Sequence, residues 1–226
     1  LGIAVCMLAL AAPRAMAELR EYLVSNNEHF ADAVGRINNE SNIGDENEIV
    51  LMHDITLEGN YILTNGKTTT IKGEGKTITV NSGAGIKVTG EKTTLNLGAN
   101  GYDKKLTIEG DGDAKIQAAF VTVSEGATAN MYEHVTLQNW KSAGNACVVI
   151  MGSDPVTGSK SVFNMNGGVI ENCSRAVMAD SGTTFNMSGG EIRNREGSRG
   201  SGVHVFEATF VMSGGTISGC TANEGG

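Results

Sequence analysis

One phrase occurs three times near the C-terminal end of the chain. The copies read FNMNGGVI (residues 163–170), FNMSGGEI (185–192) and FVMSGGTI (210–217), and they start 22 and 25 residues apart. A fixed phrase at such a period is typical of a solenoid protein, in which each copy forms one coil that stacks on the coil before it. The repeat constrains the fold more than any other feature of the sequence.

The residues within the phrase predict the kind of coil. Phe and Met alternate with Asn or Ser in the first two copies, which is the period of a strand with one buried face. The Gly pair allows the backbone to turn through conformations that other residues resist. The Ile beyond the pair begins a new inward-facing strand. We therefore predict an all-β chain that folds as a β-solenoid.

Degenerate copies of the phrase extend the repeat toward the N-terminus. Aligning Ile71 with Met187 places Thr69 in the position of Phe185, and Met131 gives a further partial match. These earlier copies carry Ile, Leu or Thr in place of Phe and Met but keep the alternation. At about 22–26 residues per coil, roughly seven or eight coils fit into the repeat region, which we assign to residues 48–226.

Residues 18–47 precede the repeats and predict a short helix with a polar linker. Four apolar residues recur at helical spacing, and an Asn ahead of them is a candidate N-cap. The apolar residues are Phe30, Ala33, Val34 and Ile37, and the candidate caps are Asn26 and Asn27. Such a helix would cover the first coil and keep that open end from pairing with another chain.

The first 17 residues have the pattern of a secretion signal. An apolar run over residues 1–12 is followed by Ala15 and Ala17 in the A-x-A arrangement of a signal-peptidase site, so cleavage is expected before Glu18. The alternative, a buried N-terminal helix, is less favoured because the run has no polar face. The run is also short for a bilayer span, so no transmembrane segment is predicted. We expect the protein to be extracellular or at the cell surface.

Both ends of the sequence are abrupt. No initiator Met precedes Leu1, so the signal peptide, residues 1–17, is expected to be incomplete. The chain stops after Gly226, where the next inward strand of a coil should begin. We therefore expect a β-helix that is truncated at its C-terminus.

The acidic charge of the chain disfavours two classes of partner. Its formal net charge is −8 at pH 7. Nucleic acids and anionic membranes are bound through a cationic surface, so neither is expected as a partner. The 31 Gly and 2 Pro residues, with 5% aromatic residues, suit many turns between short strands.

Asn recurs at a fixed place after inward aliphatic residues, and two segments interrupt the repeat. Asn139, Asn172 and Asn194 each stand two places after an inward aliphatic residue. They predict either a ladder of stacked Asn side chains or a simple turn preference, and we favour the ladder. The segments 98–113 and 151–160 are expected to leave the coils as inserted loops that offer a binding surface.

With the phrase F-x-M-x-G-G-x-I-x-x-N, the chain resembles right-handed parallel β-helix proteins of the pectin-lyase-like group. It resembles most closely the bacterial surface proteins and adhesins built from such repeats. The resemblance implies a right-handed parallel β-helix over most of residues 48–226. Because enzymes and non-enzymatic adhesins share this fold, it implies little about activity.

Enzymes of the group are lyases with clustered carboxylates that bind calcium, or hydrolases with paired aspartates. This chain has no Asp-Asp or His-Gly pair, so no catalytic residue is assigned and an enzyme is not favoured. Glu109, Asp111 and Asp113 are the candidate calcium ligands, since alternating carboxylates on a Gly-rich segment suit a hard cation. A solvated turn is the favoured reading of this segment, and no other cofactor or metal is expected.

The sequence also predicts the surroundings of the Cys residues and of two aromatic residues. Cys173 and Cys220 occupy the same position in coils that are two steps apart. At about 4.8 Å per coil, the distance between them is roughly 10 Å. This distance is too long for a disulfide, so they are not expected to bond. Cys147 aligns near Val177 and is expected to be a small apolar core residue. Trp140 and Tyr132 either stack a sugar ring or pack in the core.

These observations lead to one functional hypothesis and one competitor. The first is a secreted bacterial surface protein, adhesin-like or a structural stalk, whose partners are a host or matrix glycan or protein or a neighbouring cell. The competitor is a polysaccharide lyase or glycoside hydrolase that acts on acidic glycans. Since every repeated residue already has a structural role, function is expected where the repeat is broken.

Overall fold

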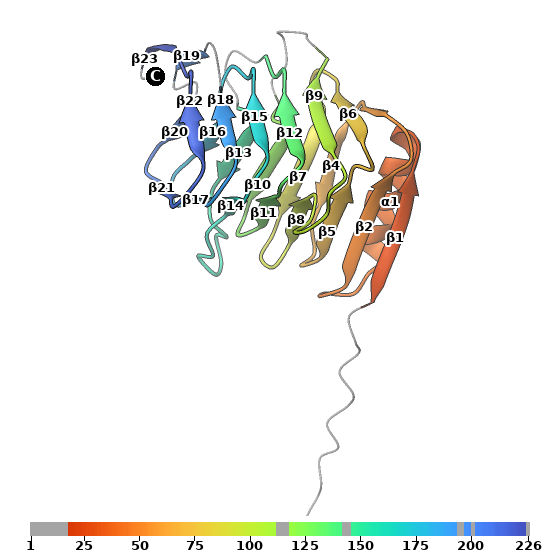
Figure 1. Ribbon diagram of the computed structural model, residues 1–226. Coiled ribbons are helices and arrows are strands. Elements are labelled where there is room, and N and C mark those ends of the chain that lie inside the picture. The colour runs from red at the N-terminus through yellow and green to blue at the C-terminus, as the bar shows by residue number, and fades with distance from the viewer. Residues whose placement is uncertain (1–17, 112–117, 142–145, 194–196, 200–201, 225–226) are drawn as a thin grey trace, which may run out of the picture.

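The computed structural model describes residues 18–111, 118–141, 146–193, 197–199 and 202–224. Its strands form three all-parallel sheets of eight, seven and six strands and a separate two-stranded pair. Figure 1 shows the coils stacked side by side, from the N-terminal strands in red to the C-terminal strands in blue. The predicted all-β parallel β-helix is confirmed.

Each complete coil contributes one strand to each of the three sheets in turn. The first sheet contains β1 (Leu19–Val24), β2 (Glu46–Leu51), β5 (Thr68–Lys72), β8 (Thr94–Leu97), β11 (Thr128–Met131), β14 (Val162–Met165), β17 (Thr184–Met187) and β21 (Thr209–Met212). The second contains β3 (Ile55–Leu57), β6 (Lys76–Val80), β9 (Leu106–Gly110), β12 (Val135–Gln138), β15 (Val169–Glu171), β18 (Glu191–Arg193) and β22 (Thr216–Ser218). The third contains β4 (Asn60–Leu63), β7 (Gly85–Thr89), β10 (Val121–Ser124), β13 (Val148–Met151), β16 (Val177–Ala179) and β20 (Val203–Val205). The separate pair is β19 (Gly197–Arg199) with β23 (Ala222–Glu224).

The strand register confirms the alignment of the repeats. Phe163, Phe185 and Phe210 lie opposite one another in β14, β17 and β21, and the Met residues two places later do the same. The Phe rings stack, with centroids 5.4 and 4.9 Å apart. Pairing through β8 and β11 places Thr69 in the same inward column, as predicted. The repeated apolar residues therefore form continuous columns along the core.

Coil length varies more than the repeat predicted. Side chains that meet on adjacent coils of the first sheet are 26, 34, 34 and 22 residues apart along the chain. Two of these steps exceed the predicted 22–26 residues. They contain the connection from β8 to β9 and the connection from β13 to β14, within or next to the segments 98–113 and 151–160 where insertions were expected. The expectation is wrong for residues 106–110, which form β9 of the second sheet and do not leave the coil. Inserted loops thus lengthen two coils without disturbing the register of the strands.

The Gly pairs make the corner between the first and second sheets. The second Gly of each pair has a positive φ: 80° at Gly168, 81° at Gly190 and 84° at Gly215. The neighbouring coil also lies very close. A Cβ atom on Gly190 would lie 2.7 Å from the carbonyl oxygen of Gly168. Both the backbone conformation and the close approach therefore require glycine here.

Replacing Gly190 by alanine should therefore be more harmful than the same change at Gly83. Both have φ +81°, but a Cβ on Gly83 would meet nothing within 4 Å. Gly83→Ala should cost about 1–2 kcal/mol from the left-handed backbone alone. Gly190→Ala should cost about 1–3 kcal/mol more because the added atom overpacks against the next coil. Urea denaturation measures both, and equal losses of stability would contradict the close-approach argument.

An Asn ladder is present, but on different residues from those predicted. Asn130 donates to Asn96 and Asn164 donates to Asn130, each at 2.8 Å, and Asn186 donates to Asn164 at 2.9 Å. These residues lie on the outer face of the first sheet, between the Phe and Met columns. They satisfy part of each other's amide hydrogen-bonding capacity along the stack.

The predicted ladder at the other corner is wrong for its described members. Asn139 and Asn172 have φ values of 61° and 52°, and no hydrogen bond joins their side chains in the described structure. They are turn residues, because Asn tolerates the left-handed backbone that ends β12 and β15. Asn194 lies outside the described residues.

The N-terminal helix is confirmed and is preceded by a strand. Helix α1 (Asn27–Glu40) begins after Asn26, whose side chain accepts a hydrogen bond of 2.8 Å from the backbone nitrogen of His29. Its predicted apolar residues are all buried: Phe30, Ala33, Val34 and Ile37. Figure 1 shows α1 at the N-terminal end of the stack, beside β1 and β2.

The first sheet starts earlier than the predicted boundary at residue 48. Strand β1 pairs in parallel with β2 and lies within the segment for which only a helix and a linker were predicted. Only Tyr22 and Val24 of this strand are buried, so its apolar alternation is too short to stand out in the sequence.

A buried lysine fixes the other end of the helix. The Lys67 side chain is 5% exposed, and its ammonium donates to the carbonyl oxygens of Ile37, at 3.1 Å, and of Ser41. A cation at this position satisfies carbonyls that the last helical turn leaves unpaired and complements the helix dipole.

Candidate functional site

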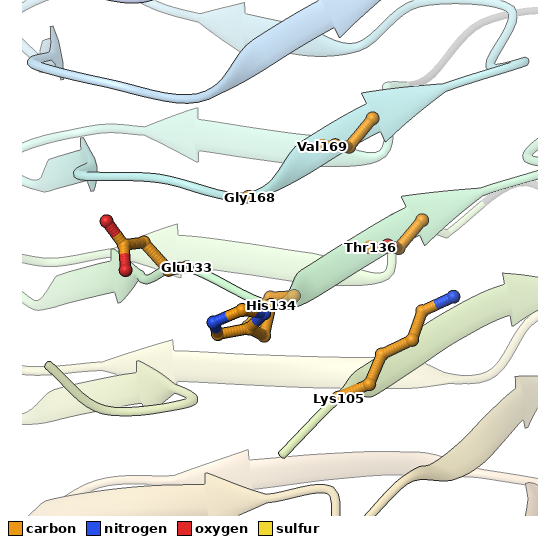
Figure 2. A pocket seen from close by; sticks show the side chains of 7 residues that line it. Lys105, Glu133, His134, Thr136, Gly168 and Val169 are labelled. Atoms are coloured by element: carbon orange, nitrogen blue, oxygen red, sulfur yellow. The ribbon is translucent and has the colours of Figure 1, made fainter. Parts of the chain in front are cut away.

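A pocket of about 460 Å³ lies at the corner between the first and second sheets. It is lined by Lys105, Glu133, His134, Val135, Thr136, Gly168 and Val169. Figure 2 shows that these residues come from three neighbouring coils, with Lys105 ahead of β9, the central residues around the start of β12, and Gly168 and Val169 at the start of β15. We call this set the corner pocket. It is open to solvent, because Lys105, Glu133 and His134 are exposed.

The corner pocket exists because this coil lacks the Gly pair. Glu133 and His134 stand between β11 and β12, where later coils carry Gly167 with Gly168 and their equivalents. His134 has a φ of 63°, a conformation that costs free energy in a residue with a side chain. Its carbonyl oxygen accepts a hydrogen bond of 3.0 Å from the backbone nitrogen of Leu106, which ties the turn to the preceding coil.

The next coil provides the space for the Glu133 side chain. A Cβ atom on Gly167 would lie 2.8 Å from Glu133 Cγ, so the glycine allows the longer side chain to lie against it. Glu133, His134 and Lys105 are all exposed to solvent. The coil thus places charged and imidazole groups at a corner that is otherwise formed by backbone.

The chemistry of the corner pocket suits a polar ligand. Lys105 offers three hydrogen-bond donors, Glu133 accepts, and the imidazole of His134 does either. Val135 is buried and Val169 half-buried, so part of the lining is apolar. Glu133 is the one carboxylate among the lining residues, so the pocket does not supply the carboxylate pair that glycoside hydrolysis commonly uses.

The sequence contains a signal for this site, although it was not singled out. Met131 is a partial match to the repeat, and Glu133 and His134 follow it where the aligned phrase continues with Gly167 and Gly168. A coil that has the inward Met but no Gly pair necessarily has side chains at the corner between the first and second sheets. The break becomes visible only once the register is known.

The candidate calcium ligands do not form a described site. Glu109 accepts a hydrogen bond of 2.7 Å from the Gln138 side chain, and Asp111 accepts one of 3.2 Å from the backbone nitrogen of Ser82. Asp113 lies outside the described residues. Among the residues that the structure describes, no group of three or more His, Cys, Asp or Glu side chains could hold a metal ion. Calcium binding by this segment stays an untested prediction.

Cys147 is buried in the core, as expected, but it also forms a bond that was not predicted. Cys147 forms a disulfide with Cys173, 26 residues later, with a Cα–Cα distance of 6.5 Å. The pairing register puts Val148, not Cys147, opposite Val177, so Cys147 lies one residue earlier, near the corner that precedes β13. Cys173 lies at that corner in the next coil. Cys220 is free, in agreement with the prediction that it does not bond to Cys173.

Trp140 belongs to the core and offers no sugar platform. Its side chain is fully buried, and its ring centroid lies 4.3 Å from that of Phe120. The packing alternative is therefore correct for this residue. Tyr132 is half-buried beside the corner pocket.

Comparison of the chain with protein-family models, with curated proteins and with solved structures gave no match. Within the described residues, no helix is both long enough and apolar enough to cross a membrane. The assignment of the fold as a parallel β-helix therefore rests on the strand pairing itself, with three sheets in which every neighbour is parallel.

Proposed function

We propose that this chain is an exported, surface-exposed β-helix protein that acts as a structural stalk or adhesin and is not an enzyme. The observation that carries the proposal is the continuous stack of coils. The eight strands of the first sheet, at about 4.8 Å per step, extend over roughly 34 Å. Each coil is joined to the next by backbone hydrogen bonds and by side-chain columns, which makes the stack stiff along its axis.

Two observations support export. The apolar run over residues 1–12 is followed by an A-x-A pattern that ends at Ala17, as in a signal-peptidase site. The disulfide between Cys147 and Cys173 is a bond that persists in oxidising compartments outside the cytosol. A protein that displays a rigid stack outside the cell fits both.

We propose the corner pocket as the contact surface for a host or matrix glycan or protein. Function is expected where the repeat is broken, and here the broken turn places a carboxylate and an imidazole on one coil, next to the cation of Lys105 on the preceding coil. His134 also retains an unfavourable backbone conformation, and such strain is often found at functional positions. The backbone of this corner is held by the stacked coils, so binding has to order only the exposed side chains.

A triple variant tests this surface. Lys105→Gln, Glu133→Gln and His134→Asn together remove the charges and the imidazole, while Asn retains tolerance for the left-handed backbone. We expect binding to immobilised matrix glycans and proteins to fall at least about tenfold, as expected for loss of about 1.4 kcal/mol or more. The melting temperature should be unchanged or slightly higher. Surface plasmon resonance and circular dichroism measure the two effects.

A matched control separates the pocket from general surface charge. His53→Asn, Glu58→Gln and Lys160→Gln make the same three chemical changes at exposed positions outside the corner pocket. This variant should bind as the unchanged protein does. If both triple variants bind equally well, the corner pocket is not the contact surface.

The competing enzymatic function has its own direct test. The mature protein is incubated with polygalacturonate and related glycans, with and without calcium. We expect neither unsaturated ends, which a lyase would produce, nor new reducing sugar, which a hydrolase would release. Turnover that is abolished by substitution of residues in this chain would refute the non-enzymatic role.

A further inference from the structure

The backbone nitrogen at the predicted cleavage site is held by a buried carboxylate. The nitrogen of Glu18 donates to Asp45 Oδ1 at 3.3 Å, and the Glu18 carbonyl oxygen accepts from the nitrogen of Glu46 at 3.1 Å. Glu18 directly follows Ala17, where the A-x-A pattern ends. The residue that processing would make the N-terminus is therefore already fixed in place by the turn ahead of β2.

Asp45 is unusual because it is an acidic residue that is only 4% exposed. Its Oδ2 atom accepts a hydrogen bond of 2.7 Å from the backbone nitrogen of Asn42. The Arg20 Nε atom lies 3.8 Å from Oδ2 and is itself buried, with no hydrogen-bond partner in the described structure. Burying a carboxylate is costly unless cations and donors surround it, so this site favours additional positive charge.

We propose that Asp45 is a preformed binding site for the α-ammonium group of Glu18, created when the leader is removed after Ala17. Hydrolysis adds water across the amide between Ala17 and Glu18. The new carboxylate leaves with the leader, and the nitrogen of Glu18 becomes a primary amine that takes up a proton. The nitrogen stays beside Asp45 Oδ1, and a neutral amide hydrogen bond becomes a charge-assisted one.

The other charges around the site are compatible with a further cation. The exposed Glu18 carboxylate pairs with the Arg20 guanidinium at 3.0 Å. Lys67 contributes a favourable electrostatic effect on Asp45, but its ammonium is bound by backbone carbonyls at the end of α1. The hydrogen bond from Asn42 is the main cause that lowers the pKa of Asp45, against the opposing effect of burial.

The consequence is a fold that becomes more stable on processing. The ammonium pair ties the start of β1 to the turn that leads into β2, at the edge of the first sheet. A chain that retains its leader has only the amide hydrogen bond there. This inference rests on the export step of the proposed function, but it concerns stability and not the contact surface.

The effect should depend on pH in a defined direction. The pKa of Asp45 is lowered in the folded protein, so its contribution is complete above the ordinary carboxyl range and disappears as pH falls through the lowered pKa. An α-amino group has a pKa of about 7.7–8.0 when unpaired, and pairing raises it. Its contribution is complete below that range and disappears as pH rises through the raised pKa. The stabilisation should be largest from weakly acidic to neutral pH.

Two proteins test the proposal without any export step. One begins at Glu18, released from a fusion by a protease that leaves no extra residue, and the other retains Ala15, Met16 and Ala17. At pH 6 we expect the protein that begins at Glu18 to melt about 2–4 °C higher. The difference should vanish at pH 11. Equal melting temperatures at pH 6 would overturn the proposal.

Two further comparisons assign the effect to the ion pair. Asp45→Asn should abolish the difference between the two proteins, and a difference that persists would contradict the role of Asp45. Because this variant removes a buried carboxylate that is hydrogen-bonded to the backbone, the substitution can itself disrupt folding. Nα-acetylation of the protein that begins at Glu18 therefore provides a second test. Acetylation restores a neutral amide and should lower the melting temperature to that of the extended protein.

The cleavage site is tested separately. N-terminal sequencing of the exported protein should begin at Glu18, and cleavage at another bond would overturn the processing step. The result at Asp45 and the result for binding at the corner pocket are independent, so failure of one is distinguishable from failure of the other.

Discussion

Replacing Phe185 by alanine should lower the free energy of unfolding by about 3–5 kcal/mol, the usual cost of removing a fully buried Phe side chain. Phe185 is 0% exposed, and its ring stacks on Phe163 at 5.4 Å and on Phe210 at 4.9 Å. Alanine at this position leaves a cavity between the rings of Phe163 and Phe210. Urea denaturation followed by circular dichroism measures the change.

The stacking of the coils also predicts how the loss of stability appears in urea denaturation. In a solenoid each coil contacts only its neighbours, so a cavity between β14 and β21 weakens the coupling of the last coils to the rest. We expect a lower slope of unfolding free energy against urea in addition to a lower midpoint. Phe206→Ala is the control, because Phe206 is 54% exposed and its loss should change stability by no more than about 0.5 kcal/mol. Similar effects of the two substitutions would contradict the assignment of Phe185 to the core column.

Removing the disulfide should have the second large effect. The bond between Cys147 and Cys173 closes a loop with a sequence separation of 26. Chain-entropy arguments give a stabilisation of about 3.5 kcal/mol for a loop of this size. The double variant Cys147→Ala, Cys173→Ala should lose this amount, and dithiothreitol should destabilise the unchanged protein but not the variant.

Cys220 provides the matched control for the disulfide. It is free and half-buried, so Cys220→Ala should leave the response to dithiothreitol unchanged. Titration of thiols in the denatured, unreduced mature protein should detect one free thiol. Detection of three would show that the bond between Cys147 and Cys173 does not form.

The core columns were predictable because they are periodic. Thr69 and Phe185 share a column although their side chains differ, since the residues two places later, Ile71 and Met187, keep the same phase. The helix was predictable for the same reason, from four apolar residues at helical spacing. Strand β1 was not, because only two of its residues are buried and so short an alternation occurs by chance.

The contacts between coils were harder to predict. The Asn ladder lies on Asn96, Asn130, Asn164 and Asn186, and its members are separated by 34, 34 and 22 residues. A column with such unequal steps cannot be recognised by spacing. The disulfide was missed because Cys147 was aligned with the inward Val177, whereas the register places Val148 there and Cys147 one residue earlier, at the corner where Cys173 of the next coil also lies.

The amino-acid sequence alone therefore sets the coil: its inward Phe, Met and Ile columns, its glycine corner and the helix at its start. These features depend on local period, and a period can be read along one chain. The partner of Cys147, the members of the Asn ladder, the corner pocket and the contact of Glu18 with Asp45 depend on which residues become neighbours in adjacent coils. The lengths of the inserted loops and the packing between coils decide which residues become neighbours. These contacts can therefore be identified only when the coils are stacked.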